Sequence, residues 1–146
     1  MKTVLVASRK GLLVVQGDGA DWSVAAHHFA GDPVTQVMVD PRNGDWYAAL
    51  RLGHFGVKMR KSSDQGVTWN EIGVPAFPIK PKEGQWAEDP TPWNVEMGWS
   101  LAAGGASEPG VVWAGCMPAG LFKSTDGGAP WQLNKPMWEA PRRLGW

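Results

Sequence analysis

Short runs of alternating apolar and polar residues, separated by turns rich in glycine and proline, recur along the chain. Six such runs form two sets with the same internal order, at residues 34–40, 46–50 and 56–61 and at residues 95–101, 111–115 and 120–123. A period of two is typical of half-buried β-strands. One more short strand is expected after each set, starting at Trp69 and at Trp131. The pattern therefore predicts two units of four antiparallel strands.

A nine-residue motif follows each set. Residues 61–69 read KSSDQGVTW and residues 123–131 read KSTDGGAPW, so both fit K-S-x-D-x-G-x-x-W. A carboxylate inside a tight turn can accept backbone N–H groups, the glycine allows a positive φ, and the tryptophan ring can cover the turn. We interpret the following motif residues as structural: Ser62, Asp64, Gly66, Trp69, Ser124, Asp126, Gly128 and Trp131.

The N-terminal residues form a degenerate third copy of this arrangement. Residues 3–7 correspond to the second run of a set and residues 11–15 to the third run, while residues 16–19 and Trp22 stand where the motif would be. No counterpart of the first run precedes them. This unit is therefore expected to have three strands.

The motif S-x-D-x-G-x-x-W resembles the Asp box, or bacterial neuraminidase repeat, of sialidases, sortilin-type receptors, photosystem II assembly factors and many bacterial propellers. Residues 7–12 and 53–58 also resemble uncharacterised bacterial sialidase-like proteins. The resemblance implies an all-β fold, a partial β-propeller of four-stranded antiparallel blades with two full blades and an incomplete first blade. It places the box in the hairpin between the third and fourth strands of a blade. Pro130 replaces the usual threonine, which should leave its hairpin intact.

This interpretation divides the chain into one partial propeller domain with five segments. They are an incomplete first blade (1–30), a second blade (31–75), a proline-rich connection (76–92), a third blade (93–137) and a linker toward a missing blade (138–146). Propellers typically have 4–8 blades. The chain is thus expected to be the N-terminal part of a larger propeller that does not close its ring alone. Open blade edges predict self-association.

The resemblance also implies that function gathers at one mouth of the central channel, where loops between the second and third strands meet the blade connections. Residues in these segments are candidates for holding a carbohydrate or another small polar ligand, against the alternative of an ordinary solvated rim. The candidates are Arg9, Lys10, Asp32, Arg51, His54, Glu88 and Asp89. Of these, Arg9, Arg51 and His54 are the preferred ligand contacts.

Two functions compete. A sialidase-like glycoside hydrolase needs three arginines that grip a carboxylate, a tyrosine nucleophile assisted by a glutamate, and an aspartate acid/base. Tyr47 is the only tyrosine, and its position inside a predicted strand indicates packing. We therefore expect a non-catalytic binding or scaffold unit without catalytic residues, with an incomplete part of a sialidase-like hydrolase as the alternative.

Composition narrows the possible partners and cofactors. The 14 basic and 14 acidic residues cancel, which argues against nucleic acid or an anionic membrane as the partner. No apolar run is long enough for a signal peptide or a membrane span, so a cytoplasmic location is expected. The single Cys116 excludes an intrachain disulfide and is expected to be buried. His27 and His28 should point to opposite faces of a strand, so neither a metal nor a cofactor is expected.

Overall fold

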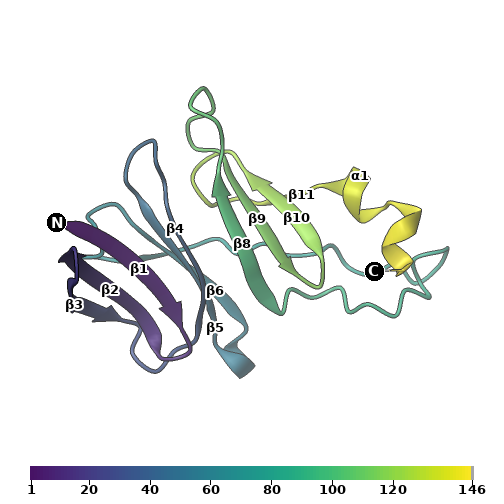
Figure 1. Cartoon of the computed structure of the whole chain (residues 1–146). Coiled ribbons are helices and arrows are strands. Elements are labelled where there is room, and N and C mark those ends of the chain that lie inside the picture. Colours follow the sequence, from purple (N-terminus) through teal and green to yellow (C-terminus); the bar gives the residue numbers. More distant parts are fainter. Residues whose placement is uncertain (146) are drawn as a thin grey trace.

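The computed structural model describes residues 1–145 and consists mainly of three antiparallel β-sheets that stand side by side in a row (Figure 1). The first sheet contains β1 (Lys2–Ser8), β2 (Gly11–Asp18) and β3 (Asp21–His28). The second contains β4 (Val34–Val39), β5 (Trp46–Arg51), β6 (Val57–Ser62) and β7 (Asn70–Ile72). The third contains β8 (Met97–Ala103), β9 (Val112–Met117), β10 (Gly120–Ser124) and β11 (Gln132–Leu133).

Strands follow one another in space in the order of the chain within every sheet. The sequence prediction of an all-β fold with units of three, four and four strands is therefore confirmed at the level of sheets. Three short helical segments complete the fold, namely η1 (Gly53–Phe55), α1 (Lys135–Trp138) and η2 (Pro141–Gly145).

Two hydrophobic cores lie between the sheets, and β5 contributes to both of them. Successive side chains of a strand point to opposite faces of its sheet. Tyr47 and Ala49 accordingly pack in the core with Leu101 and Val112 of the third sheet, whereas Ala48 and Leu50 pack in the other core. The second core also contains Leu12 of the first sheet and Val34 of the second. Burial on both faces explains why the whole run 46–50 is buried.

The first motif closes the hairpin between β6 and β7. The Ser62 hydroxyl accepts the Gly66 amide at 2.8 Å and donates to Asp64 at 2.7 Å. The Asp64 carboxylate also accepts the amide and the hydroxyl of Thr68, at 2.8 and 2.6 Å. Gly66 has a φ of 89°, a value at which a side chain would be strained.

The second motif builds the same network between β10 and β11. The Ser124 hydroxyl accepts the Gly128 amide and donates to Asp126, both at 2.9 Å. Pro130 has no N–H to offer, and the Ala129 amide donates to Asp126 in its place, at 2.9 Å. The predicted equivalence of the two hairpins is confirmed, and the proline leaves the turn intact as expected.

Each motif tryptophan packs against the end of the preceding sheet. The Trp69 ring lies 5.7 Å from the His28 ring and 5.0 Å from the Phe29 ring. The Trp131 indole donates to the Gly73 carbonyl at 2.8 Å. The motif therefore contributes to the joint between two sheets as well as to its own turn.

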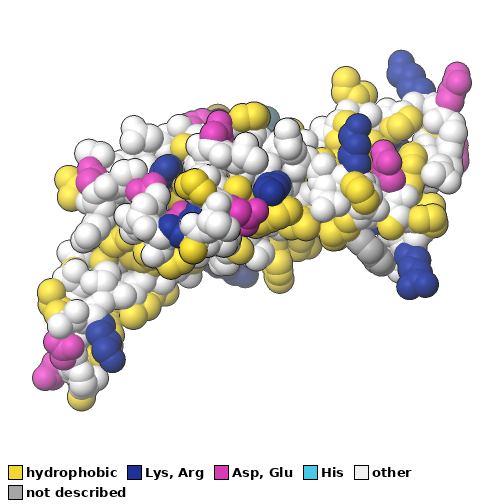
Figure 2. Space-filling view, turned by 90° about the horizontal axis from the view of Figure 1, so that it is seen from above, with side chains coloured by type: hydrophobic (Ala, Val, Ile, Leu, Met, Phe, Trp, Pro, Cys, Tyr) yellow, Lys and Arg dark blue, Asp and Glu magenta, His cyan; other side chains and the backbone are white. Residues whose placement is uncertain are grey.

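Among residues 1–145 the edge strand β1 pairs with β2 alone, so its other edge is open within this part of the chain. Val4 and Val6 of this strand are 45% and 38% exposed. Seen from above, hydrophobic side chains form a band along one long edge of the row of sheets (Figure 2). Self-association through this edge stays a prediction.

The C-terminal residues are more ordered than a linker. Asn134 caps α1, because its side chain accepts the Met137 amide at 3.1 Å, and Pro136 suits the first turn of a helix. Beyond α1 the chain turns back, and Trp138 and Arg143 are buried against the connection between the second and third sheets. Within the predicted linker 138–146, residues 141–145 form η2 and only Trp138 and Arg143 are buried among residues 138–145. Its role as a linker toward another blade stays a prediction, and Trp146 lies outside the described residues.

Candidate functional site

Several of the loops that the sequence predicted as ligand contacts lie along one edge of the row of sheets, at the same end of the strands. At this end β1 turns into β2 through Arg9 and Lys10, and β5 passes into β6 through residues 52–56. The strands β4 and β8 begin at the same end, since Val34 pairs with Leu50 and Met97 pairs with Met117. All three sheets therefore contribute backbone to one surface.

A hollow of about 500 Å³ opens on this surface between the sheets. We call it the mouth hollow. Its lining includes Ser8, Arg9, Thr35, Arg51, Met97 and Trp99. The sequence prediction of Arg9 and Arg51 as neighbours at one site agrees with this placement, although a role in binding a ligand stays a prediction.

Thr35 and Trp99 reach the hollow because both are bulge residues. The pairing of β4 with β5 skips Thr35, and the pairing of β8 with β9 skips Trp99. A β-bulge leaves one residue unpaired and redirects its side chain. Thr35 also donates from its hydroxyl to the Gly98 carbonyl at 2.7 Å, which ties the two bulges together. Trp99 is left 64% exposed.

The mouth hollow combines positive charge with an aromatic surface. Neither Arg9 nor Arg51 forms an ion pair with any residue in 1–145, and no carboxylate lines the hollow. Guanidinium groups donate hydrogen bonds in a planar fork that suits carboxylates and other oxygen-rich groups. An exposed indole offers a flat apolar face beside them. This set of groups can hold a polar ligand by hydrogen bonds and by contact with a flat ring.

Three other predicted site residues, Lys10, His54 and Asp32, are not among the lining residues of the hollow. Lys10 is exposed in the β1–β2 turn, where its carbonyl lies 2.7 Å from Nε2 of His27. His54 is exposed in η1, with its ring 5.7 Å from that of Phe55. Asp32 is exposed just before β4. None of the predicted carboxylates converges with the arginines there.

Glu88 and Asp89 are neighbours in the long connection between the second and third sheets, but they differ in burial. Glu88 is exposed, whereas Asp89 is only 1% exposed. The Asp89 carboxylate accepts the Thr91 amide, the Trp93 indole and the Arg143 guanidinium. The placement of Asp89 among surface ligand contacts is therefore corrected to that of a buried ion pair.

Tyr47 and Cys116 take the packing positions expected of them. Tyr47 is 1% exposed, and its hydroxyl donates to the Gly127 carbonyl of the third sheet at 3.2 Å. Burial raises the pKa of Tyr47, although the nearby Lys61 lowers it in part. Burial also raises the pKa of the Cys116 thiol to about 11, which keeps it protonated. Neither group is placed to act as a nucleophile in the mouth hollow.

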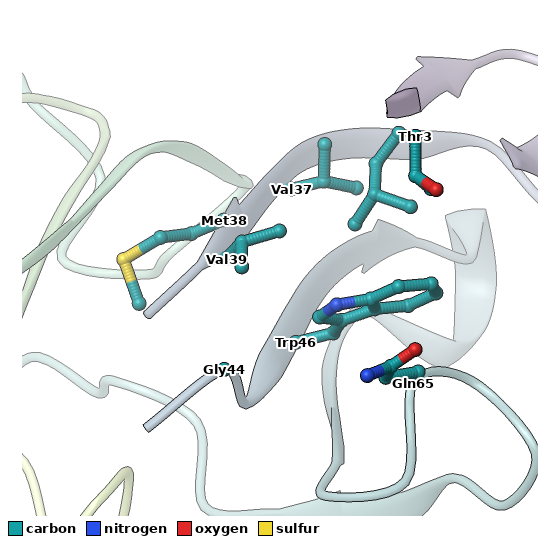
Figure 3. A pocket seen from close by; sticks show the side chains of 8 residues that line it. Thr3, Val37, Met38, Val39, Gly44, Trp46 and Gln65 are labelled. Carbon is teal, nitrogen blue, oxygen red and sulfur yellow. The ribbon is translucent and has the colours of Figure 1, made fainter. Parts of the chain in front are cut away.

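A second hollow, of about 460 Å³, lies between the first and second sheets at their opposite end (Figure 3). Thr3, Val37, Val39, Trp46 and Gln65 are among its lining residues. In the described part of the chain no charged side chain lines it, so it offers fewer directional contacts to a polar ligand than the mouth hollow does.

No group of three or more histidine, cysteine, aspartate or glutamate side chains within residues 1–145 is arranged to hold a metal ion. The helical segments described for these residues are too short to cross a bilayer.

Comparison with known proteins supports the fold alone. No protein-family model matches the chain, and no curated protein matches it either. Among solved structures it is similar to the GH74 xyloglucanase from Xanthomonas campestris, with a TM-score of 0.54 and 18% sequence identity over 86% of this chain. The chain spans 17% of the length of that enzyme. This similarity agrees with a propeller-like arrangement of the three sheets.

Proposed function

We propose that the three sheets are blades of an incomplete Asp-box β-propeller, and that the chain is a non-catalytic binding unit. Its ligand is a carbohydrate or a similar small polar molecule held in the mouth hollow. The observation that carries this proposal is that Arg9, Arg51 and the exposed ring of Trp99 line one hollow. Each of these three residues comes from a different sheet.

The sheet order supports the propeller part of the proposal. Antiparallel sheets of up to four strands in chain order, joined from the last strand of one to the first strand of the next, are the repeating unit of propellers. The two S-x-D-x-G-x-x-W hairpins occupy the same place in successive sheets. The likeness to a xyloglucanase supports this arrangement independently of the motif.

The missing carboxylates support the non-catalytic part. Most glycoside hydrolases place two carboxyl groups about 5–10 Å apart across the scissile bond. No carboxylate of residues 1–145 lines the mouth hollow, and Asp89 is enclosed by its own partners. A second candidate, part of a glycoside hydrolase whose remaining groups lie outside this chain, is favoured by the structural neighbour and by the two arginines.

The two functions separate in one set of assays. Calorimetric titration with a glucuronic-acid oligosaccharide and with a neutral xyloglucan oligosaccharide tests binding, and fluorogenic sialoside and glucoside substrates test turnover. We expect binding of at least one sugar, weakened about tenfold or more by Arg51→Ala or Trp99→Ala, and no turnover. Trp113→Ala, which removes a tryptophan outside the hollow, is the matched control.

The absence of binding to both oligosaccharides, or binding that Arg51→Ala and Trp99→Ala leave unchanged, would refute the proposed site. Turnover of either substrate above that of a heat-inactivated sample would replace the binding function with the hydrolase alternative.

A further inference from the structure

Three tryptophans surround one buried arginine at the far end of the molecule from β1. The guanidinium carbon of Arg143 lies 3.7 Å from the ring centre of Trp138, 4.7 Å from that of Trp86 and 5.8 Å from that of Trp93. Trp86 and Trp93 belong to the connection between the second and third sheets, while Trp138 ends α1. In Figure 1 the yellow segment that contains α1 and the turn after it lies near the connection at this end.

A buried carboxylate completes this tryptophan cage, which we define as Trp86, Asp89, Trp93 and Trp138. Nη2 of Arg143 donates to Asp89 at 2.8 Å, and Nε donates to the Trp138 carbonyl. Asp89 and Arg143 are 1% and 4% exposed. The cage is therefore closed to solvent when the arginine occupies it.

The cage keeps its negative charge. Burial alone would raise the pKa of Asp89. Hydrogen bonds from the Trp93 indole, the Thr91 amide and the guanidinium outweigh this effect and lower the pKa to about 2. Two of these three donors come from the connection itself. The connection thus holds an ionised carboxylate beside aromatic rings. The Arg143 guanidinium is the third hydrogen-bond donor to this carboxylate.

The geometry favours a guanidinium over an ammonium group. A guanidinium is flat, so one face can stack on Trp138 while N–H groups on two different nitrogens reach two different acceptors. An ammonium group is a compact point charge that is more strongly hydrated, and it cannot stack in this way. Desolvation in a closed cage makes this difference larger.

We propose that the tryptophan cage is a guanidinium-binding site, for which the chain's own C-terminal segment supplies Arg143 as the ligand. A small free guanidinium compound then occupies the same place when the arginine side chain is removed. The site is separate from the mouth hollow, since the two share no lining residue.

Chemical rescue tests this assignment. Arg143→Ala is expected to lower the midpoint of thermal unfolding by several degrees, because Asp89 loses its charged partner and the rings lose their packing. Ethylguanidinium at millimolar concentration, well below denaturing levels, should restore at least half of the loss with a saturable dose response. Ethylammonium at the same concentration is the matched control and should restore little.

Two further variants keep the test decisive. Arg143→Lys retains a cation, and it replaces Arg143→Ala if the alanine variant does not fold. Asp89→Asn combined with either change should abolish the rescue. The proposal is overturned if ethylguanidinium stabilises neither Arg143 variant, if ethylammonium restores as much, or if the rescue survives Asp89→Asn.

Discussion

The second and third sheets have the same strand order and the same motif, yet equivalent aromatic residues meet different surroundings. Tyr47 of β5 pairs with Lys61 of β6, and Trp113 of β9 pairs with Lys123 of β10. In both pairs the ammonium group lies over the ring, at 5.4 and 5.1 Å from its centre. Tyr47 is buried against the third sheet, whereas Trp113 is half-buried and lines an open hollow of about 330 Å³.

The comparison separates two contributions to the fold. The repeated sequence pattern determines the strands, the turn and the lysine-over-ring contact, which are alike in both sheets. Burial depends on whether another sheet stands alongside. In the second sheet the face that carries Tyr47 is covered by the third sheet. The equivalent face of the third sheet carries Trp113 and borders the hollow instead.

The motif tryptophans differ in a similar way. The Trp131 indole donates to Gly73, whereas the buried Trp69 indole has no hydrogen-bond partner among residues 1–145. Trp69 instead packs edge-on against Phe29 and His28. The same motif residue thus joins one pair of sheets through a hydrogen bond and the other through aromatic packing.

The largest expected effect tests the difference in burial. Tyr47→Ala should lower the free energy of unfolding by about 3–5 kcal/mol, because it leaves a cavity between two sheets. Trp113→Ala should cost about 1 kcal/mol or less, since its ring is already open to solvent on one side. Urea denaturation followed by circular dichroism measures both. Equal losses would show that the two positions are equally covered in solution and would contradict the comparison.

The motif tryptophans should give a smaller contrast. Trp131→Phe leaves the Gly73 carbonyl without its donor and should cost about 1–3 kcal/mol. Trp69→Phe removes a buried donor that has no partner, so its loss of packing is partly offset and the net cost should be about 1 kcal/mol or less. The same denaturation measurement applies. A larger loss for Trp69→Phe would contradict the assignment of the two joints.

The smallest effect concerns the pH dependence of the first motif. Hydrogen bonds from the Thr68 hydroxyl and amide, and then from Ser62, lower the pKa of Asp64 to about 2. Because this value is below that of the unfolded chain, the carboxylate stabilises the fold above about pH 4, and this contribution is lost as pH falls toward 2. Carboxyl chemical shifts in an NMR titration should show the low midpoint. Thr68→Val should move it upward, and an unchanged midpoint would contradict this cause.

Sequence patterns predicted the features that depend on local chemistry. Asp64 and Asp126 lie in equivalent hairpins because turn hydrogen bonds span only a few residues. Arg9 and Arg51 were expected at one site because the repeat aligns the loops that carry them, and both do line the mouth hollow.

Features that depend on distant partners were missed. Thr35 and Trp99 reach the hollow through bulges, which are properties of the pairing between strands and leave no mark in a period-two pattern. Asp89 was misplaced because its partner Arg143 is 54 positions away in a segment expected to be a linker.

Binding at the mouth hollow is tested most directly by NMR of the indole N–H groups during titration with the same two oligosaccharides. The ten tryptophans give separate probes, and Trp99→Phe and Trp113→Phe assign the two that matter. The proposal predicts a saturable shift of the Trp99 signal with at least one sugar, an unchanged Trp113 signal, and loss of the shift in Arg51→Ala. A shift confined to Trp113, or no shift of Trp99 with either sugar, would contradict it.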